Sequence, residues 1–318
     1  MILDFERPVK ELEERIVELR RLAGESGELR AEISRLEEAL DAAKRRIYLN
    51  LTPYQRVQVA RHADRPNFRA YRDALADDFY ELSGDRLYRD DPAIQGGFAR
   101  IGSRNVVLLG HDKGKDVRSR VKGNFGMAHP EGYRKVKRLY ELAGRFGLPI
   151  VVLVDTPGAF AGREAEERGQ AWAISEDLMA LARAPVPVVS VVIGEGGSGG
   201  ALAMCAADYV GMLENSYLSV IAPEACASII FRDASRAEEA AEAMKITARD
   251  LKDHAIIDEV LPEPLGGAHN EPDAAVDAVG EALQRVLSGL DGVDAKSLLH
   301  ARYERYRRMG SHTAGHSD

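Results

Sequence analysis

The segment VVSVVIGEGGSGGALAMC, from Val188 to Cys205, decides the fold class, because an apolar β-type stretch runs directly into a helix-like stretch of small residues. Five glycines stand between Gly194 and Gly200 and leave the backbone there without side chains to cover it. Successive N–H groups at a helix start carry the positive end of the helix dipole and point at whatever lies there. The segment therefore predicts an oxyanion or phosphate site at a strand-to-helix turn.

Two other motifs overlap the same glycines. Gly194-x-Gly196-x-x-Gly199 matches the fingerprint of dinucleotide-binding proteins, and Glu214 stands where a ribose-binding acid is expected. Against this interpretation, the segment lies late in the chain. The apolar helix also ends near Asp208, which is short for the crossover helix of that fold.

The second motif, Gly196-x-Ser198-x-Gly200, matches the nucleophile elbow of serine hydrolases. Such an enzyme needs an acid and a histidine further along the chain, and the candidates are Asp258, Glu259 and His269. A run with five glycines produces this match almost by chance. Close packing of a helix on a strand explains one or two of the glycines but not all five.

Short β-branched stretches bounded by Gly or Pro alternate with helical segments through the rest of the chain. We expect strands at 105–109, 150–154, 186–193, 209–213 and 217–221, and helices at 133–146 and 164–182. Continuous apolar strands interleaved with helices predict an α/β layered core with both faces of the sheet covered.

The two ends of the chain are predicted to be helical. Apolar spacing over residues 10–48, broken between Gly24 and Gly27, predicts a helical hairpin. A further helix is expected at 66–84 and another at 273–308, followed by a frayed tail at 311–318. We therefore divide the chain into an N-terminal helical arm region, residues 1–90, and a main α/β domain, residues 91–318.

Composition and charge limit the class of protein and the cellular compartment to which the chain can belong. The net charge of −8 over 318 residues argues against a surface built for nucleic acid. The start of the chain has neither a basic leader nor an apolar signal core, and no apolar run reaches the roughly 18 residues of a membrane span. Cys205 and Cys226 form no CxxC pair and suit a reducing compartment, so we expect a cytoplasmic protein without a zinc site of its own.

A second glycine turn, from Asp155 to Gly162, follows the strand expected at 150–154. It stands at the carboxyl end of a parallel-type strand, where α/β proteins usually bind ligands. A basic cluster precedes both turns and is either a phosphate site, for example for coenzyme A, or a solvated charge run. Its members are Lys113, Lys115, Arg118, Arg120 and Lys122.

Taken together, the motifs resemble the alpha-subunit family of bacterial acetyl-CoA carboxylase carboxyltransferases. The resemblance covers nearly the whole chain, and its motifs follow one another at consistent spacing. They start at Leu3 (LDFE), Gly84 (GDR), Gly110 (GHDKG), Asn124 (NFGM), Pro130 (PEGYRK), Asp155 (DTPGAF), Ala165 (AEERGQ), Gly194 (GEGGSGGALA), Pro223 (PEACASI) and Pro262 (PEPLGGAH).

The resemblance implies a crotonase-like fold of stacked ββα units, with active sites completed across a subunit interface. It implies transfer of a carboxyl group from carboxybiotin, on the biotin carboxyl carrier protein, to acetyl-CoA. The product is malonyl-CoA, the first committed intermediate of fatty acid synthesis. The implied partners are a zinc-containing beta subunit in an alpha2beta2 assembly and, in the holoenzyme, biotin carboxylase.

The same resemblance implies roles for the two glycine turns. The N–H groups of Gly199 and Gly200 would form the oxyanion hole for the biotin ureido oxygen. The residues expected to shape the biotin pocket are Gly158, Ala159, Gly196, Gly197 and Ser198. No metal is expected in this chain. The chain departs from the family pattern at residues 161–164 (AGRE), where a proline and a glycine are usual, and at Asn270, where a basic residue is common.

Two functions from other classes remain open. A single-chain crotonase-type acyl-CoA hydratase or isomerase would share the fold, but it needs paired carboxylates, for which Glu195 and Glu224 are the candidates. A scaffold without activity is suggested by the helical arm.

Overall fold

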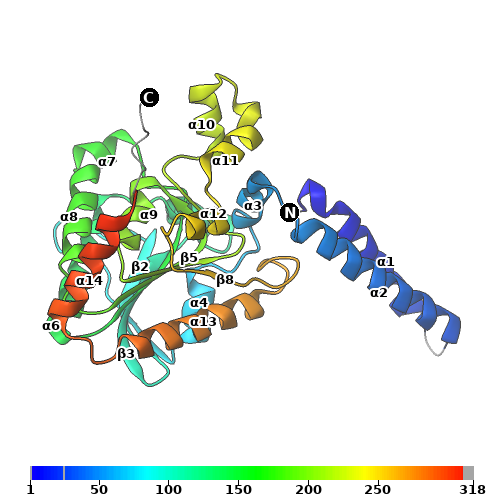
Figure 1. Cartoon of the computed structure of the whole chain (residues 1–318), viewed down its shortest axis with the longest axis horizontal. Helices are drawn as coiled ribbons and strands as arrows, with labels where there is room; N and C mark the ends of the chain where they lie inside the picture. The colour runs from blue at the N-terminus through cyan, green and yellow to red at the C-terminus, as the bar shows by residue number, and fades with distance from the viewer. Residues whose placement is uncertain (1, 24–25, 311–318) are drawn as a thin grey trace, which may run out of the picture.

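The structure is a computed structural model that describes residues 2–23 and 26–310. Its centre is one sheet in the order β1-β2-β3-β4-β5-β6-β8, with β7 beside the end of β5 (Figure 1). The first three strands pair antiparallel, and from β3 onward every pairing is parallel. The strands are β1 (Asp78–Glu81), β2 (Ile94–Ile101), β3 (Arg104–His111), β4 (Ile150–Thr156), β5 (Val188–Gly197), β6 (Tyr209–Leu213), β7 (Tyr217–Ser219) and β8 (Glu259–Leu261).

Helices cover both faces of this sheet, as the sequence predicts. Alternate residues of β4 point to opposite sides, as the two-residue period of a strand requires. Val152 packs with the layer of α6 (Pro130–Phe146), α8 (Gln170–Ala182) and α9 (Ser198–Cys205). Val151 packs with α4 (Phe68–Leu75) and α13 (Pro272–Gly289) on the other face.

Further helices surround these layers. They are α3 (Pro53–Ala60), α5 (Val117–Lys122), α7 (Arg163–Glu167), α10 (Pro223–Ile230), α11 (Ala237–Met244), α12 (Ala248–Asp253) and α14 (Ala295–Arg308). Within the residues that the structure describes, no helix is long and apolar enough to cross a membrane.

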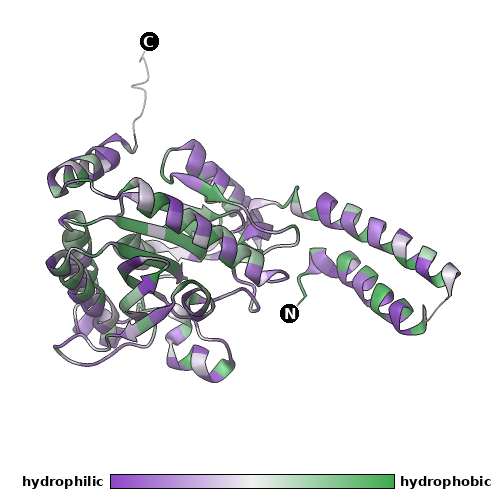
Figure 2. Ribbon diagram, turned by 90° about the horizontal axis from the view of Figure 1, so that it is seen from below, coloured by the Kyte–Doolittle hydropathy of each residue, from purple (hydrophilic) through white to green (hydrophobic). Residues whose placement is uncertain are grey.

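An arm of two antiparallel helices, α1 (Arg7–Ala23) and α2 (Gly27–Tyr48), projects from this body (Figure 1). Figure 2 shows the two helices side by side with hydrophilic and hydrophobic residues alternating along them. Ile16 and Leu19 of α1 are buried. The predicted hairpin is therefore confirmed, although part of its predicted break, Gly24 and Glu25, lies outside the described residues.

A buried carboxylate fixes the root of the arm. Glu6 accepts hydrogen bonds from the hydroxyl of Tyr48 (2.5 Å) and the backbone N–H of Leu3 (3.1 Å), and it pairs with Nε2 of His269 (2.8 Å). The ring of His62 lies 4.1 Å from that of His269 between centroids. One potential metal-ligand atom from each of Glu6, His62 and His269 lies within 4.8 Å of the other two. The positions of these residues along the sequence do not indicate this proximity. Both Glu6 oxygens are already engaged in the contacts given above.

Three helix predictions need correction. The helix expected at 66–84 ends at Leu75, and residues 78–81 form β1, because they pair with β2 and backbone pairing overrides helical propensity. The helix expected at 164–182 is interrupted at Gly169, whose φ of +80° begins a new helix, α8. The helix expected at 273–308 is two helices, with Gly292 at φ +75° between them. The predicted frayed tail, 311–318, lies outside the described residues.

The division of the chain near residue 90 stays a prediction. Phe68 and Tyr71 of α4, which precede that boundary, are fully buried against the sheet. The strand β1 also precedes it and forms one edge of the same sheet.

Candidate functional site

The two glycine turns meet at the carboxyl ends of neighbouring parallel strands, β4 and β5. A Cβ atom on Gly197 would collide with the carbonyl of Pro157, so the last residue of β5 touches the loop after β4. The point where a Cβ on Gly158 would stand is 3.8 Å from the carbonyl oxygen of Gly197 and 3.9 Å from Cβ of Ser198. The fold thus brings two segments about 40 residues apart into direct contact.

The first turn of α9 presents backbone N–H groups at this point. The helix begins at Ser198, and the first N–H groups of any helix lack partners within it. Among the described residues, no side chain caps α9. Gly199 is half-buried, and a Cβ on it would make ordinary van der Waals contact with Ile174, whose nearest atom is 3.6 Å away. Gly200 is buried.

Hydrogen bonds hold the loop after β4 in place. The hydroxyl of Thr156 donates to the carbonyl of Gly126 (2.7 Å) and accepts from the N–H of Gly158 (3.0 Å). The side-chain amide of Gln170 donates to the carbonyl of Phe160 (2.8 Å). Because the loop is fixed at both ends, its geometry against α9 is set before any ligand arrives.

The comparisons with known proteins agree with one another. A protein-family model described as acetyl co-enzyme A carboxylase carboxyltransferase-like matches residues 2–310. The acetyl-coenzyme A carboxylase carboxyl transferase subunit alpha of Rubrobacter xylanophilus is 80% identical, over 98% of this chain and 97% of that protein. The chain belongs to this alpha-subunit family. It is accordingly a carboxyltransferase, an enzyme subunit of the acetyl-CoA carboxylase complex.

More distant relatives agree with this assignment. The alpha subunit of Thermus thermophilus is 50% identical over 98% of this chain and 99% of its own length. Among solved structures, transcarboxylase 12S aligns with a TM-score of 0.57 at 21% identity, over 73% of this chain and 44% of that one. A Pseudomonas malonate decarboxylase hetero-tetramer gives a TM-score of 0.59 at 20% identity, over 76% and 98% of the chains. These two similarities confirm the crotonase-like fold.

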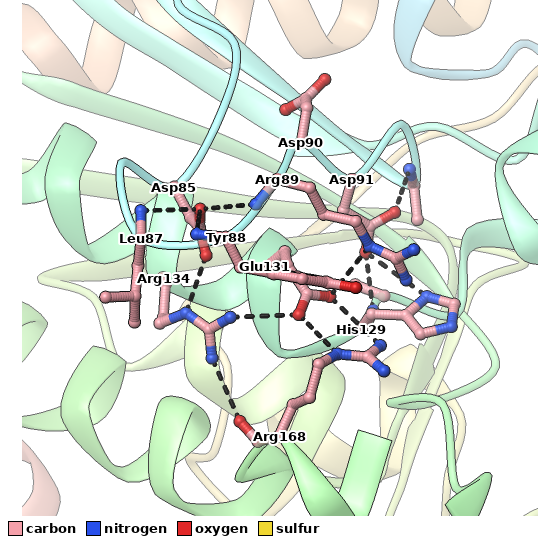
Figure 3. Close-up of polar contacts among 12 residues, drawn as sticks. Asp85, Leu87, Tyr88, Arg89, Asp90, Asp91, His129, Glu131, Arg134 and Arg168 are labelled. Carbon is pink, nitrogen blue, oxygen red and sulfur yellow. Dashed lines mark hydrogen bonds and ion pairs between the residues drawn. The ribbon is translucent and has the colours of Figure 1, made fainter. Parts of the chain in front are cut away.

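A polar network gathers at the start of α6 (Figure 3). Glu131 is fully buried and accepts hydrogen bonds from Arg134 (3.0 Å) and Arg168 (2.7 Å). Burial alone would raise the pKa of Glu131, but the hydrogen bond from Arg168 and the charges of both arginines hold it below its ordinary value. Asp85 accepts from Arg134 (2.8 Å) and from the N–H groups of Leu87, Tyr88 and Arg89.

The network joins three motifs of the family, around Gly84, Pro130 and Ala165, and it was not foreseen. Arg168 belongs to the motif that starts at Ala165. The structure uses its guanidinium to tie the beginning of α8 to the beginning of α6. The three motifs were the sequence signal available for this network. Each contains an acidic residue or an arginine that a solvent-exposed loop does not require.

The carboxylate Glu195 is committed to ion pairs and cannot serve as an acid-base group. Its oxygens lie 2.6 Å from Nε of Arg61 and 2.5 Å from Nζ of Lys113, and it accepts from the hydroxyl of Tyr217 (2.8 Å). Burial would raise its pKa, but the charges of Lys113 and Arg61 outweigh burial and lower the pKa to about 2. Glu224 is paired with Arg61 as well (2.6 Å). A general acid needs a pKa near the working pH, so the hydratase alternative is not supported.

The basic cluster before the turns is divided by the fold. Lys113 points inward to Asp155 (2.7 Å) and Glu195, so it fits neither a phosphate site nor a solvated charge run. Arg120 donates to the carbonyl of Ala63 (2.7 Å). The other three, Lys115, Arg118 and Lys122, are exposed on or beside α5.

The hydrolase alternative has one feature in its favour and lacks the rest. Ser198 has a φ of +51°, as in a sharp strand-to-helix elbow. However, His269 is paired with Glu6, Asp258 with Arg305, and Glu259 with Arg285. None of these candidates is available to Ser198 as a catalytic partner.

The dinucleotide alternative fails because Gly194 and Gly196 are inside strand β5 and not in a phosphate-binding turn. A Cβ on Gly194 would stand 2.5 Å from Oδ1 of Asp155, and one on Gly196 would stand 2.6 Å from Cδ1 of Leu218. These two glycines are required for packing against neighbouring segments. The glycines of this motif thus serve two purposes. Those in β5 permit close packing, and those at the start of α9 leave backbone N–H groups uncovered by side chains.

Proposed function

We propose that the first turn of α9 is the oxyanion hole in which the chain catalyses carboxyl transfer from carboxybiotin to acetyl-CoA. The observation that supports this most directly is the uncapped helix start at Ser198, Gly199 and Gly200, facing the ordered loop at Gly158 and Ala159. An oxygen that becomes negatively charged during a reaction is best stabilised by such fixed backbone donors.

The donor chemistry suits the carboxylated ureido ring of biotin. When bound, that ring supplies the carboxyl group and takes up negative charge on its carbonyl oxygen as the group leaves. The N–H groups of Gly199 and Gly200 would donate to this oxygen. A comparable donor in other enzymes contributes about 3 to 4 kcal/mol of transition-state stabilisation. No side chain of this chain is required as an acid or a base.

The walls of the proposed biotin pocket are backbone rather than side chains. Gly158, at φ +148°, and Ala159 form one wall, and Gly196, Gly197 and Ser198 form the other. The planar ureido ring can approach such surfaces closely because almost no Cβ atoms stand in the way.

The proposal requires partner proteins. The alpha-subunit family implies a beta subunit, to which we assign the zinc ribbon and most of the acetyl-CoA site, in an alpha2beta2 assembly. Leu202 of α9 and Val220 after β7 are large apolar side chains that are 51% and 80% exposed beside the turn, as expected of a surface that a partner covers. The biotin carboxyl carrier protein would deliver carboxybiotin after biotin carboxylase had loaded it, in the cytoplasm.

The test is Gly199→Val in the complex with the beta subunit, assayed for malonyl-CoA formation from the carboxylated carrier. The added side chain crowds Ile174 and alters the N–H directions, so we expect kcat to fall about 10²- to 10³-fold with assembly retained. Gly289→Val is the matched control, because a Cβ on Gly289 meets nothing within 4 Å. Unchanged carboxyl transfer by Gly199→Val would refute the proposed function.

A further inference from the structure

Tyr133 of α6 carries a polar group whose placement hydrogen bonding does not explain. Its side chain is fully buried. Within the part of the chain that the structure describes, its hydroxyl makes no hydrogen bond. A buried hydroxyl without a partner costs free energy of folding, and phenylalanine would keep the ring without that cost. The hydroxyl therefore stands at this position for a reason other than stability.

The hydroxyl lies directly behind the glycine turn of α9. It is 2.8 Å from the point where a Cβ on Gly200 would stand. The backbone nitrogen of Ala159 is 2.6 Å from the same point, and the carbonyl carbon of Gly158 is 2.8 Å from it. Three groups, from α6, from the loop after β4 and from α9, thus converge on one small volume.

We propose that Tyr133 is a positioning residue for carboxyl transfer, whose hydroxyl sets the spacing between the Gly158–Ala159 loop and the amides of Gly199 and Gly200. The inference rests on the proposed function. The hydroxyl borders the space that a side chain on Gly200 would need, together with atoms of Gly158 and Ala159, so it can set the spacing of the two segments by packing contact. Catalysis is sensitive to such spacing, because small displacements of a donor from the developing charge reduce its effect steeply.

The surroundings keep this hydroxyl neutral. Burial raises the pKa of Tyr133 well above its ordinary value, with Asp177 and Asp91 adding to the shift. Asp177 of α8 is itself fully buried, and burial raises the pKa of its carboxyl well above the ordinary range. The neighbourhood behind the turn is therefore poor at supporting charge. A neutral phenol there leaves the positive end of α9 uncompensated for a ligand.

The experiment compares Tyr133→Phe with Tyr140→Phe in the complete carboxyltransferase. Tyr140 is a matched control, because it lies on the same helix, is 2% exposed and also has a raised pKa caused by burial and by Asp177. Its hydroxyl, however, contacts the carbonyl of Ala203 (3.5 Å) rather than Gly200. The measurements are kcat and KM for acetyl-CoA and for free biotin, and the midpoint of thermal unfolding.

For Tyr133→Phe we expect kcat to fall about tenfold or more, KM for acetyl-CoA to stay within about twofold, and the unfolding midpoint to stay equal or rise. Tyr140→Phe should leave kcat unchanged. A purely structural hydroxyl would move stability and leave kcat alone. Wild-type kcat in Tyr133→Phe overturns the inference, and so does a lowered midpoint, failure to fold included, because either result removes the reason to assign the hydroxyl to catalysis. If Gly199→Val stays active, the proposed function fails; if Gly199→Val is inactive and Tyr133→Phe is fully active, only this inference fails.

Discussion

The backbone nitrogen of Ala159 lies 2.6 Å from the point that a Cβ atom on Gly200 would occupy. The loop after β4 and the start of α9 therefore pack directly together, because Gly200 has no side chain to separate them. The smallest possible addition at this position must displace one of the two segments, since backbone atoms cannot yield as a flexible side chain can.

Gly200→Ala should consequently damage both the fold and the activity. We expect a loss of about 1 to 3 kcal/mol in the free energy of unfolding, from overpacking, together with a loss of carboxyl transfer. Urea unfolding and the malonyl-CoA assay measure the two effects. The control is Gly27→Ala in α2, where a Cβ meets nothing within 4 Å. Equal stability of the Gly200→Ala variant and the parent would contradict the geometry.

The ion pairs of Glu195 predict a specific loss of stability in acid. Its pKa in the folded chain is about 2, against an ordinary value of 4.5, so its contribution is fully present above pH 4.5 and is lost as the pH falls toward 2. In Glu195→Gln, the free energy of unfolding should depend less on pH over that window. It should also be lower by about 3 kcal/mol near neutral pH, because Lys113 and Arg61 lose a partner. Unfolding measured along a pH series, with the exposed Glu242→Gln as control, checks this. The same acid slope in Glu195→Gln and the parent would show that another group is responsible.

The buried imidazole of His111 predicts a second loss of stability in acid, over a higher pH range than that of Glu195. Burial, with a contribution from Lys113, lowers its pKa from 6.5 to about 3. The unfolded chain takes up a proton between these values and the folded chain does not, so stability present above pH 6.5 is lost as the pH falls toward 3. At pH 5 the loss from this group is about 2 kcal/mol. His111→Leu should remove this dependence, whereas exposed His300→Leu should keep it, as denaturant unfolding at several pH values would reveal.

The hydrogen bonds of Glu6 predict that the arm can be released without unfolding the body. Burial alone would raise the pKa of Glu6, but its hydrogen bonds with His269 and Tyr48 lower that pKa to about 2. Glu6→Gln weakens both contacts, so limited trypsin digestion should cut the arm faster while the sheet domain resists. The control is exposed Glu18→Gln, further along α1. Identical digestion of the Glu6→Gln variant and the parent would mean that other contacts anchor the arm.

The sequence predicts the centre of this fold better than its edges. The five strands expected from β-branched stretches are present, and 209–213 matches β6 in both bounds. The strand β2 was missed because Gln95, Gly96 and Gly97 have low strand propensity, and it is pairing with β3 that holds them extended. The strand β8 has only three residues and so gives almost no periodic signal.

Some residues of the site can be identified from local sequence, whereas others depend on contacts between segments far apart in the chain. Gly199 and Gly200 were recognisable because bare amides at a helix start are a local property. The partners of Glu195 were not, since Arg61 is 134 residues away and Lys113 is 82 residues away. Tyr133 resembled any other apolar-face residue of an amphipathic helix. Only the folded arrangement reveals that its hydroxyl borders Gly200.

The pairing of Glu6 with His269 has a consequence for synthesis of the chain. The two residues are 263 positions apart, so the arm emerges from the ribosome long before its anchor has been translated. The contact between Glu6 and His269 can form only after residue 269 has been synthesised. This anchor of the arm therefore depends on residues from both ends of the chain.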